Sequence, residues 1–190
     1  MRGKRLTLAF LATAGLALGA CSKGSEPDAN ATGSTAAVKP ESEPLPDMLD
    51  DAAGLQVMAE ALKETGVAGV FKGKGSYTLL AAEDAAFGQL GETGKELTEA
   101  PDHAALAALL RDHLIPGYIT PQDIAAAIDA SKDRQVSMTA LSGRKLTFAK
   151  SEDGTVTVAA PDGSQANLAG EAIAGGSSVA IPVDAVLKKI

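Results

Sequence analysis

The sequence predicts an α+β fold in which a helical layer packs on an antiparallel β-sandwich or wedge. Three observations predict it. Apolar residues recur at helical spacing as far as Ser131, while those from Val136 to Leu187 alternate with polar ones as in strands. Between the helices lies the stretch YTLLAAEDAAF, Tyr77 to Phe87, which reads as a strand leading directly into a helix. A strand that is apolar on both faces needs a layer on each side.

Composition limits the classes of protein to consider. The chain has 190 residues, of which 45% are hydrophobic and 3% aromatic, and its formal net charge is −7. It is long enough for one domain with a substantial core, which must be built mainly from Leu, Val, Ile and Ala. A chain this acidic is repelled by phosphate backbones, so we expect no nucleic-acid partner.

Residues 1–20 are predicted to be a targeting segment. Arg2, Lys4 and Arg5 precede an apolar stretch from Leu6 to Leu18, which is shorter than the ~20 residues of a membrane span. The segment ends on Leu-Gly-Ala before Cys21, the only cysteine, and so resembles a bacterial lipoprotein signal peptide. The resemblance implies lipidation of Cys21, with a palmitate-type anchor. A cleaved secretory signal beside an incidental cysteine is the alternative.

The localisation follows from the same resemblance and from the segment after it. Ser22 rather than Asp follows Cys21, which in lipoprotein sorting favours the outer membrane of the bacterial cell envelope. Residues 21–46 are rich in Ser, Thr, Ala, Glu and Pro, and we predict that they form a disordered tether. Such a tether would hold the folded domain, residues 47–190, roughly 25 to 30 Å from the membrane.

The helices are predicted in chain order. The first runs from an N-cap at Asp47 to a C-terminal stop at Gly66, and the central strand is followed by a short helix with Asp84 as its N-cap. The range 88–101 is expected to be a loop rich in Gly, Glu and Thr. A helix capped by Asp102 then continues to Pro116 and carries His113 on its apolar face.

The last helix and the strands complete the elements. Thr120 to Asp123 have the pattern of a capping box with Pro at the first helical position. Three alternating runs, separated by Gly-containing turns, predict an antiparallel meander from Val136 to Val158. One or two short strands follow, and Val179 to Leu187 form the last, in which Pro182 indicates a sheet edge or a bulge.

Four blocks of the sequence resemble the fasciclin domain family. YTLLAAEDAAF is similar to the family's first block, FTVFAPTDAAF, and LRDHLIPG is similar to its YHVVPG block. SGRKLTF with DGTVTV resembles the hairpin that follows, and VAIPVDAVL resembles the closing block, VIHVIDAVL. The blocks occur in order over the whole folded part. The resemblance implies a fasciclin-like fold and an adhesion or interaction module.

This chain keeps the residues of the family motifs at Asp84, His113, Pro116 and Asp184. The resemblance implies structural roles for these four residues. In animal members integrin adhesion is attributed to a Tyr-His motif and to Asp-Ile motifs near the closing block. Here Asp112 replaces the Tyr and no clear Asp-Ile motif is present, so integrin binding does not carry over. For His113 a proton shuttle or ligand is the alternative to a core histidine bonded to backbone.

No catalytic, metal or cofactor site is predicted. His103 and His113 lack zinc-type spacing, and no Gly-x-Ser-x-Gly elbow is present. The acidic stretch from Glu92 to Asp102 has no EF-hand pattern, so we expect a solvated loop rather than a calcium site.

The sequence therefore predicts an envelope-anchored, non-catalytic adhesion module whose partner is a protein or a polysaccharide. A binder of an apolar small molecule, such as a lipid or pigment, is the alternative function, and a hydrolase ranks below both. A ligand site for the alternative would need a cavity of roughly 300 Å³ or more.

Overall fold

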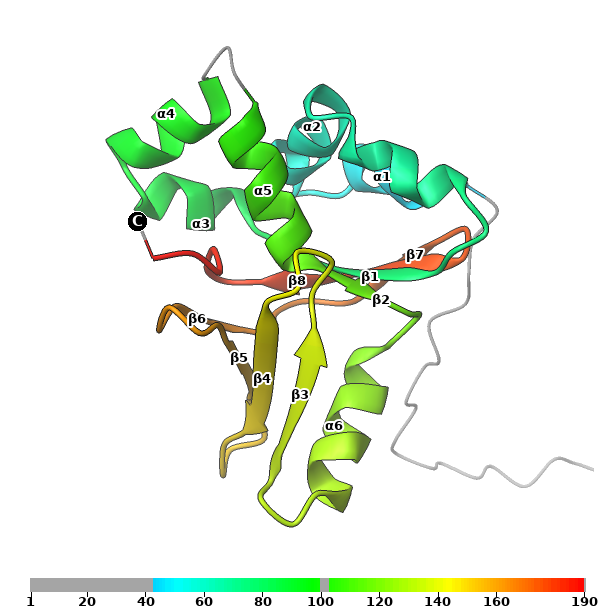
Figure 1. The fold of residues 1–190 in the computed structure, drawn as a ribbon, viewed down its shortest axis with the longest axis vertical. Coiled ribbons are helices and arrows are strands. Elements are labelled where there is room, and N and C mark those ends of the chain that lie inside the picture. The colour runs from blue at the N-terminus through cyan, green and yellow to red at the C-terminus, as the bar shows by residue number, and fades with distance from the viewer. Residues whose placement is uncertain (1–42, 100–102, 190) are drawn as a thin grey trace, which may run out of the picture. The chain divides into compact units, whose positions relative to one another are not determined.

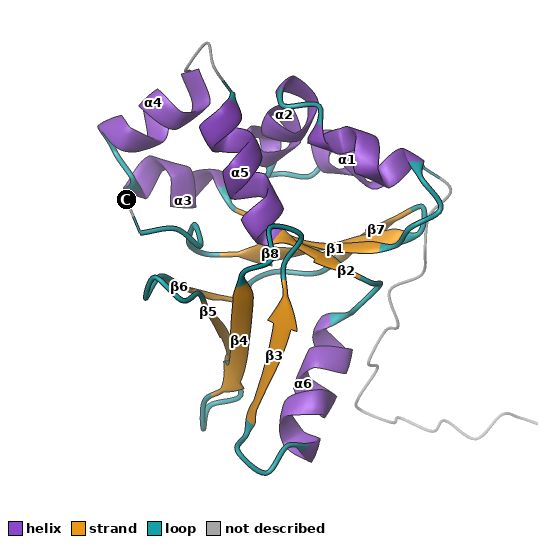
Figure 2. Cartoon of the chain, viewed as in Figure 1, coloured by secondary structure: helices purple, strands orange, loops and turns teal. Residues whose placement is uncertain are grey.

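Two four-stranded sheets form the frame of the fold (Figures 1 and 2). The computed structural model describes residues 43–99 and 103–189, all within one unit, Thr35–Ile190. The signal segment, Cys21 and the tether before residue 43 lie outside the described residues. The first sheet, here the core sheet, has the order β2-β1-β8-β7. Its strands are β1 (Tyr77–Ala82), β2 (Leu114–Pro116), β7 (Ile173–Gly175) and β8 (Ser178–Val183).

The second sheet, here the meander sheet, is antiparallel throughout, as the alternating runs predict. Its strands follow chain order because short turns join each pair, and Gly143, Gly154 and Gly163 take positive φ in these turns. The strands are β3 (Gln135–Thr139), β4 (Lys145–Lys150), β5 (Val156–Ala159) and β6 (Gln165–Asn167).

The central strand β1 is buried along its length from Thr78 to Ala82, which confirms that it is covered on both faces. It pairs antiparallel with β2 and parallel with β8. The parallel pair departs from the antiparallel arrangement predicted for the sheets. Strand β8 ends at Val183 rather than Leu187, and it is an inner strand. Pro182 is nevertheless tolerated because β7 pairs only with Ser178 to Ala180 and has ended before it.

A layer of helices covers one face of the core sheet (Figure 1). Most are short and carry their buried side chains toward the sheet. The layer consists of α1 (Leu45–Asp50), α2 (Gln56–Glu64), the 3-10 helix η1 (Val67–Lys72), α3 (Asp84–Gln89), α4 (Glu92–Glu99) and α5 (Ala104–His113).

The prediction of a single helix from Asp47 was wrong, although its predicted stop at Gly66 agrees with the end of α2 at Glu64. Two helices occupy this range, and Gly54, in a left-handed conformation with φ +81°, lies in the break between them. The first begins at Leu45, with Pro44 as its N-cap, so Asp47 is not the cap. Leu45 is fully buried, and a Cβ on Gly175 would lie 2.6 Å from its Cα. The packed domain therefore includes Leu45, although the sequence predicts that this residue belongs to the tether.

Three further expectations were also wrong. The range 88–101 is not simply a loop, because it contains α4. An ion pair between Lys95 and Glu92, one turn apart, supports this helix. The N-cap of α3 is Glu83, and Asp84 is the first helical residue. The helix predicted to reach Pro116 ends at His113, because Leu114 already extends into β2.

Helix α6 (Pro121–Ala130) begins with the predicted capping box. Thr120 Oγ1 accepts a hydrogen bond from the Asp123 backbone N–H, and Asp123 Oδ2 accepts one from the Thr120 backbone N–H at 2.9 Å. Its buried Ile124 and Ile128 face the meander sheet, and Figure 1 shows it alongside β3. This helix therefore belongs to the meander-sheet side and not to the helical layer.

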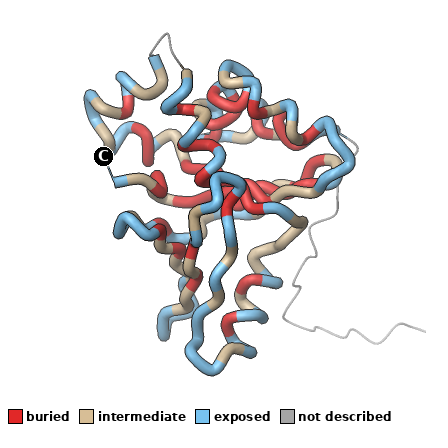
Figure 3. Tube along the Cα trace, in the orientation of Figure 1, coloured by how far each residue is buried: buried red, intermediate tan, exposed pale blue. Residues whose placement is uncertain are grey.

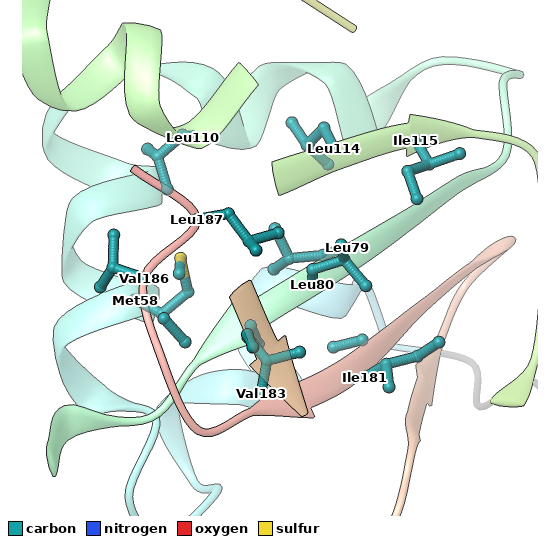
Figure 4. Close-up of a cluster of buried hydrophobic side chains, with 14 of the residues drawn as sticks. Met58, Leu79, Leu80, Leu110, Leu114, Ile115, Ile181, Val183, Val186 and Leu187 are labelled. Atoms are coloured by element: carbon teal, nitrogen blue, oxygen red, sulfur yellow. The ribbon is translucent and has the colours of Figure 1, made fainter. Parts of the chain in front are cut away.

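Aliphatic side chains build the core, as the composition predicts. Figure 4 shows part of this core, in which Met58 of α2 and Leu110 of α5 lie on the same side of the core sheet as Leu79 and Leu187. Phe148, in the meander sheet, is the largest of the fully buried side chains. Burial of these apolar side chains is the main stabilising contribution to the fold.

Candidate functional site

In the part of the chain that the structure describes, no apolar layer covers one face of the meander sheet. Side chains alternate between the two faces of a strand, so cross-strand register assigns each residue to one face. Val136, Phe148, Val158 and Ala166 form one register row and point inward. The residues between them form the other face, here the open face. They are Gln135, Ser137, Thr139, Lys145, Thr147, Ala149, Thr157, Ala159, Gln165 and Asn167.

The open face is accessible, whereas the centre of the inner face is buried. Phe148 and Val158 are fully buried, and Ala166 is 2% exposed. Helix α6 packs on this inner side, where Lys150 Nζ lies 2.8 Å from Asp129 Oδ2. All the residues of the open face are exposed or half-buried, and the colouring of β3 and β4 in Figure 3 shows the alternation. The sheet is thus rigid on one side and free to make contacts on the other.

The chemistry of the open face is that of hydroxyl, amide and methyl groups. Only Lys145, at one corner, carries a charge. Hydrogen bonds link side chains across neighbouring strands. The Ser137 and Thr147 hydroxyl oxygens lie 3.4 Å apart, and Thr157 Oγ1 donates to Asn167 Oδ1 at 2.8 Å. These contacts orient polar groups on the surface before any partner arrives.

Asp184 anchors one end of this network. Its carboxylate accepts hydrogen bonds from the Asn167 backbone N–H at 2.7 Å and from Asn167 Nδ2 at 2.8 Å. The Asp184 N–H donates to the Asn167 carbonyl at 3.1 Å, which completes the pairing of the two residues. Asp184 therefore holds the Asn167 side chain in place, and Asn167 Oδ1 accepts the hydrogen bond from the Thr157 hydroxyl.

Two shallow hollows lie along the open face. One has a volume of about 400 Å³ and is lined by residues from all four strands, among them Gln135, Thr147 and Ala159. The other has about 370 Å³ and extends past Asn167 to Asp184 and Gln89. Both are lined by Thr157 and Gln165, so they adjoin and form one continuous groove with a mixed polar and apolar lining.

His113 lies in the core, at the end of α5. Its ring is fully buried, Nδ1 lies 2.9 Å from the Leu109 carbonyl oxygen, and the Leu187 N–H donates to Nε2 at 3.1 Å. A neutral ring with the proton on Nδ1 satisfies both contacts. Burial lowers the pKa of His113, which favours this neutral form. Because backbone groups occupy both nitrogens, the ring has none left to move a proton to a substrate.

A charged network lies next to His113. Arg144, in the turn before β4, is 2.7 Å from carboxylate oxygens of both Asp112 and Asp162. The hydrogen bond to Asp112 raises the pKa of Arg144. Burial raises the pKa of Asp162, but hydrogen bonds from Ser164 and Arg144 outweigh burial and hold it well below its ordinary value. Asp162 also accepts the Lys189 N–H, so the network joins α5, two turns and the C-terminal segment.

Asp84 and Pro116, the other two family positions, also make backbone contacts. Asp84 Oδ1 accepts the Val57 N–H at 2.9 Å, and the Asp84 N–H donates to the Gly54 carbonyl at 2.8 Å. Its carboxylate thus satisfies a free N–H in the first turn of α2 rather than capping its own helix. Pro116 pairs with Tyr77 at the end of β2, which is an edge strand of the core sheet. The N–H that proline lacks is therefore not needed for a hydrogen bond between inner strands.

A larger cavity lies between α2, α4 and α5. Its volume is about 480 Å³, enough for a small ligand, and Val57, Ala61 and Leu106 form its apolar part. Three carboxylates also line it, those of Glu60, Glu64 and Glu99, together with Thr98 and His103. Burying an apolar lipid or pigment against three carboxylates would strip them of water, so this lining does not suit such a ligand.

Across residues 43–99 and 103–189, no group of three or more His, Cys, Asp or Glu side chains could hold a metal ion. In that same part of the chain, no helix is long and apolar enough to cross a bilayer.

Sequence reasoning predicted the family positions but not the open face. Its signal was present in the meander, where Ser137, Thr147 and Thr157 alternate with buried apolar residues. The alternation predicts the strands, and it also assigns the outward residues to one surface.

Comparisons with known proteins agree with this fold. A family model described as "Fasciclin domain" matches residues 53–189. A comparison with curated protein sequences finds no significant match. Among solved structures, a FAS1 domain pair from the insect cell adhesion molecule fasciclin I is similar, with a TM-score of 0.55 and 16% identity. The alignment covers 70% of this chain and 45% of that chain, so this chain spans less than half of its length. The extent of the family match shows that the chain belongs to the fasciclin domain family.

Proposed function

We propose that the chain is an envelope-anchored, non-catalytic adhesion module that binds a protein or polysaccharide partner through the open face of the meander sheet. Fasciclin domains are cell-adhesion and interaction modules and are generally non-enzymatic. The observation that carries the proposal is the open face itself. It is a broad polar surface, backed by a buried core and ordered by the hydrogen bonds of Thr157, Asn167 and Asp184.

Anchoring would place this surface where a partner can reach it. The sequence before residue 43 supports a lipid on Cys21 and a flexible tether, and Ser22 supports an outer-membrane destination. With α1 beginning at Leu45, the tether would still span roughly 25 Å. A module at that distance can turn its open face toward a partner outside the membrane surface.

The alternative of an apolar small-molecule binder has less support. The 480 Å³ cavity is large enough, but its three carboxylates oppose an apolar ligand. Binding at a surface is therefore the function that the geometry supports best.

The experiment that tests the proposal replaces one small residue at the centre of the open face with arginine. Ala159 lies at its centre, opposite Thr147 on β4 and Gln165 on β6. Ala159→Arg should abolish attachment of cells that carry the protein as their adhesin, because the long side chain covers the groove. Surface attachment and biofilm mass are measured in a strain lacking the native protein and complemented with each variant.

The matched control is Ala108→Arg, which adds the same side chain to an exposed position on α5. Unchanged attachment is expected there. Cys21→Ser should also abolish attachment by releasing the chain from the membrane fraction. Attachment that persists in cells expressing folded Ala159→Arg would disprove a role for the open face.

A further inference from the structure

We propose that the open face binds a neutral polysaccharide, an inference that rests on the proposed function and names its partner class. The groove along Thr147, Thr157 and Gln165 would be the binding site. Four features of this surface support a neutral polymer of sugars over a protein or a charged polymer.

The first feature is charge. The chain carries a formal net charge of −7, which repels an anionic polymer. The groove itself offers little charge of either sign. Lys145 lies at one corner of the face, Lys150 lines one hollow but is paired with Asp129, and the Asp184 carboxylate at the other end is already occupied by Asn167. An uncharged polymer leaves no charge unpaired here, while a polyanion would find two lysines, one of them already paired with Asp129.

The second feature is the lack of anchors for a protein. Protein interfaces draw most of their binding energy from buried aromatic or Arg side chains at their centre. The open face has none of these, and its central residues are Thr147, Ala149, Thr157 and Ala159. A sugar chain instead needs many small hydrogen-bonding groups, which this face supplies.

The third feature is the direction of those groups. Thr157 donates its hydroxyl proton to Asn167, so its oxygen can accept a hydrogen bond from an incoming sugar hydroxyl. The Gln135 and Gln165 side chains make no hydrogen bond to the described part of the chain, and each amide offers both donors and an acceptor. Sugar hydroxyls also donate and accept, so the two surfaces are complementary.

The fourth feature is shape. Four strands spaced at ~4.8 Å make the face about 14 Å across. The two adjoining hollows follow this direction, so the groove suits a linear polymer better than a compact ligand. Each contact would be weak without an aromatic platform. Many anchored copies binding one long polymer would compensate through effective concentration.

The test is affinity electrophoresis of the full chain, purified in a mild detergent. Native gels contain dextran, galactomannan or a mixed-linkage β-glucan, and alginate serves as the anionic comparison. We expect slower migration with at least one neutral polymer and none with alginate. Thr147→Val and Thr157→Val keep the strand-favouring branched shape but remove one hydroxyl each. Each should weaken binding about fivefold, the effect of one lost hydrogen bond.

Thr98→Val is the matched control, because it removes a hydroxyl from α4 and lines only the cavity near His103. It should bind as the unmodified chain does. The inference is overturned if no neutral polymer retards the chain, if alginate does so equally, or if the two sheet variants bind as tightly as the control. If no polymer retards the chain but Ala159→Arg still loses attachment, the proposed function stands, with a protein as partner.

Discussion

Arg144→Met is expected to lower the free energy of unfolding by about 2 kcal/mol. Arg144 is the shared cation of Asp112 and Asp162, at 2.7 Å from each. Asp112 is only 7% exposed, so without Arg144 its carboxylate would remain largely buried and unpaired. The loss follows from this desolvation and not from a missing surface contact. Urea unfolding at pH 7 measures it.

Lys150→Met is the matched control for Arg144→Met. It removes the cation that pairs with Asp129, whose side chain is 50% exposed, so water replaces the lost contact. The double variant Arg144→Met, Asp112→Asn should recover part of the stability, because no buried charge remains. Equal losses in the two single variants would show that the network contributes no more than a surface pair.

His113→Leu is expected to lower the free energy of unfolding by about 2 to 3 kcal/mol at pH 7. Leucine fills most of the space of the ring but cannot accept the Leu187 N–H, which lies in the core. A buried donor without a partner costs its full desolvation free energy. The same urea experiment measures this loss.

His113 should also make stability depend on pH in a defined window. Burial lowers its pKa in the folded state, so below about pH 6.5 the unfolded chain binds the proton more readily. Stability is therefore complete above pH 6.5 and falls as the pH decreases toward the folded-state pKa, by at most about 1.4 kcal/mol per pH unit. Between pH 7 and 5 this slope should disappear in His113→Leu and survive in His103→Gln. A slope that is equal in both variants would contradict the assignment.

Much of the fold could be predicted because hydrophobic periodicity reports local structure. The alternating runs placed β3, β4 and β5 correctly, and the capping-box pattern placed the start of α6. The central strand was recognised because its residues are apolar at every position, which only a strand covered on both faces needs. Each of these signals lies within a few residues of the element that it predicts.

The errors arose where tertiary contacts decide the local structure. Leu45 resembles a tether residue in a proline-rich segment, but Gly175 leaves room for it against β7, far away in the sequence. Asp84 was assigned to its own helix, whereas its carboxylate reaches the backbone of α2. The parallel pairing of β1 with β8 joins residues about a hundred positions apart, and no local pattern reports it.

The candidate site likewise has a part that local sequence patterns predict and a part that depends on tertiary contacts. Alternation determines which residues of the meander face outward, so the composition of the open face was present in the sequence. The bond from Asp184 to Asn167 and the continuity of the two hollows depend on how the segments pack. The sequence could therefore indicate the groups on this surface but not their connection into one groove.

The most direct test of the central claim is a protection measurement on whole cells. Cys21 is the only cysteine and is predicted to carry lipid, so a new cysteine can be labelled selectively. Gln165→Cys places a thiol on the open face, and Ala108→Cys places one on exposed α5. Maleimide labelling before and after attachment should fall at position 165 and stay constant at 108. Protection at 108 with full labelling at 165 would contradict partner binding through the open face.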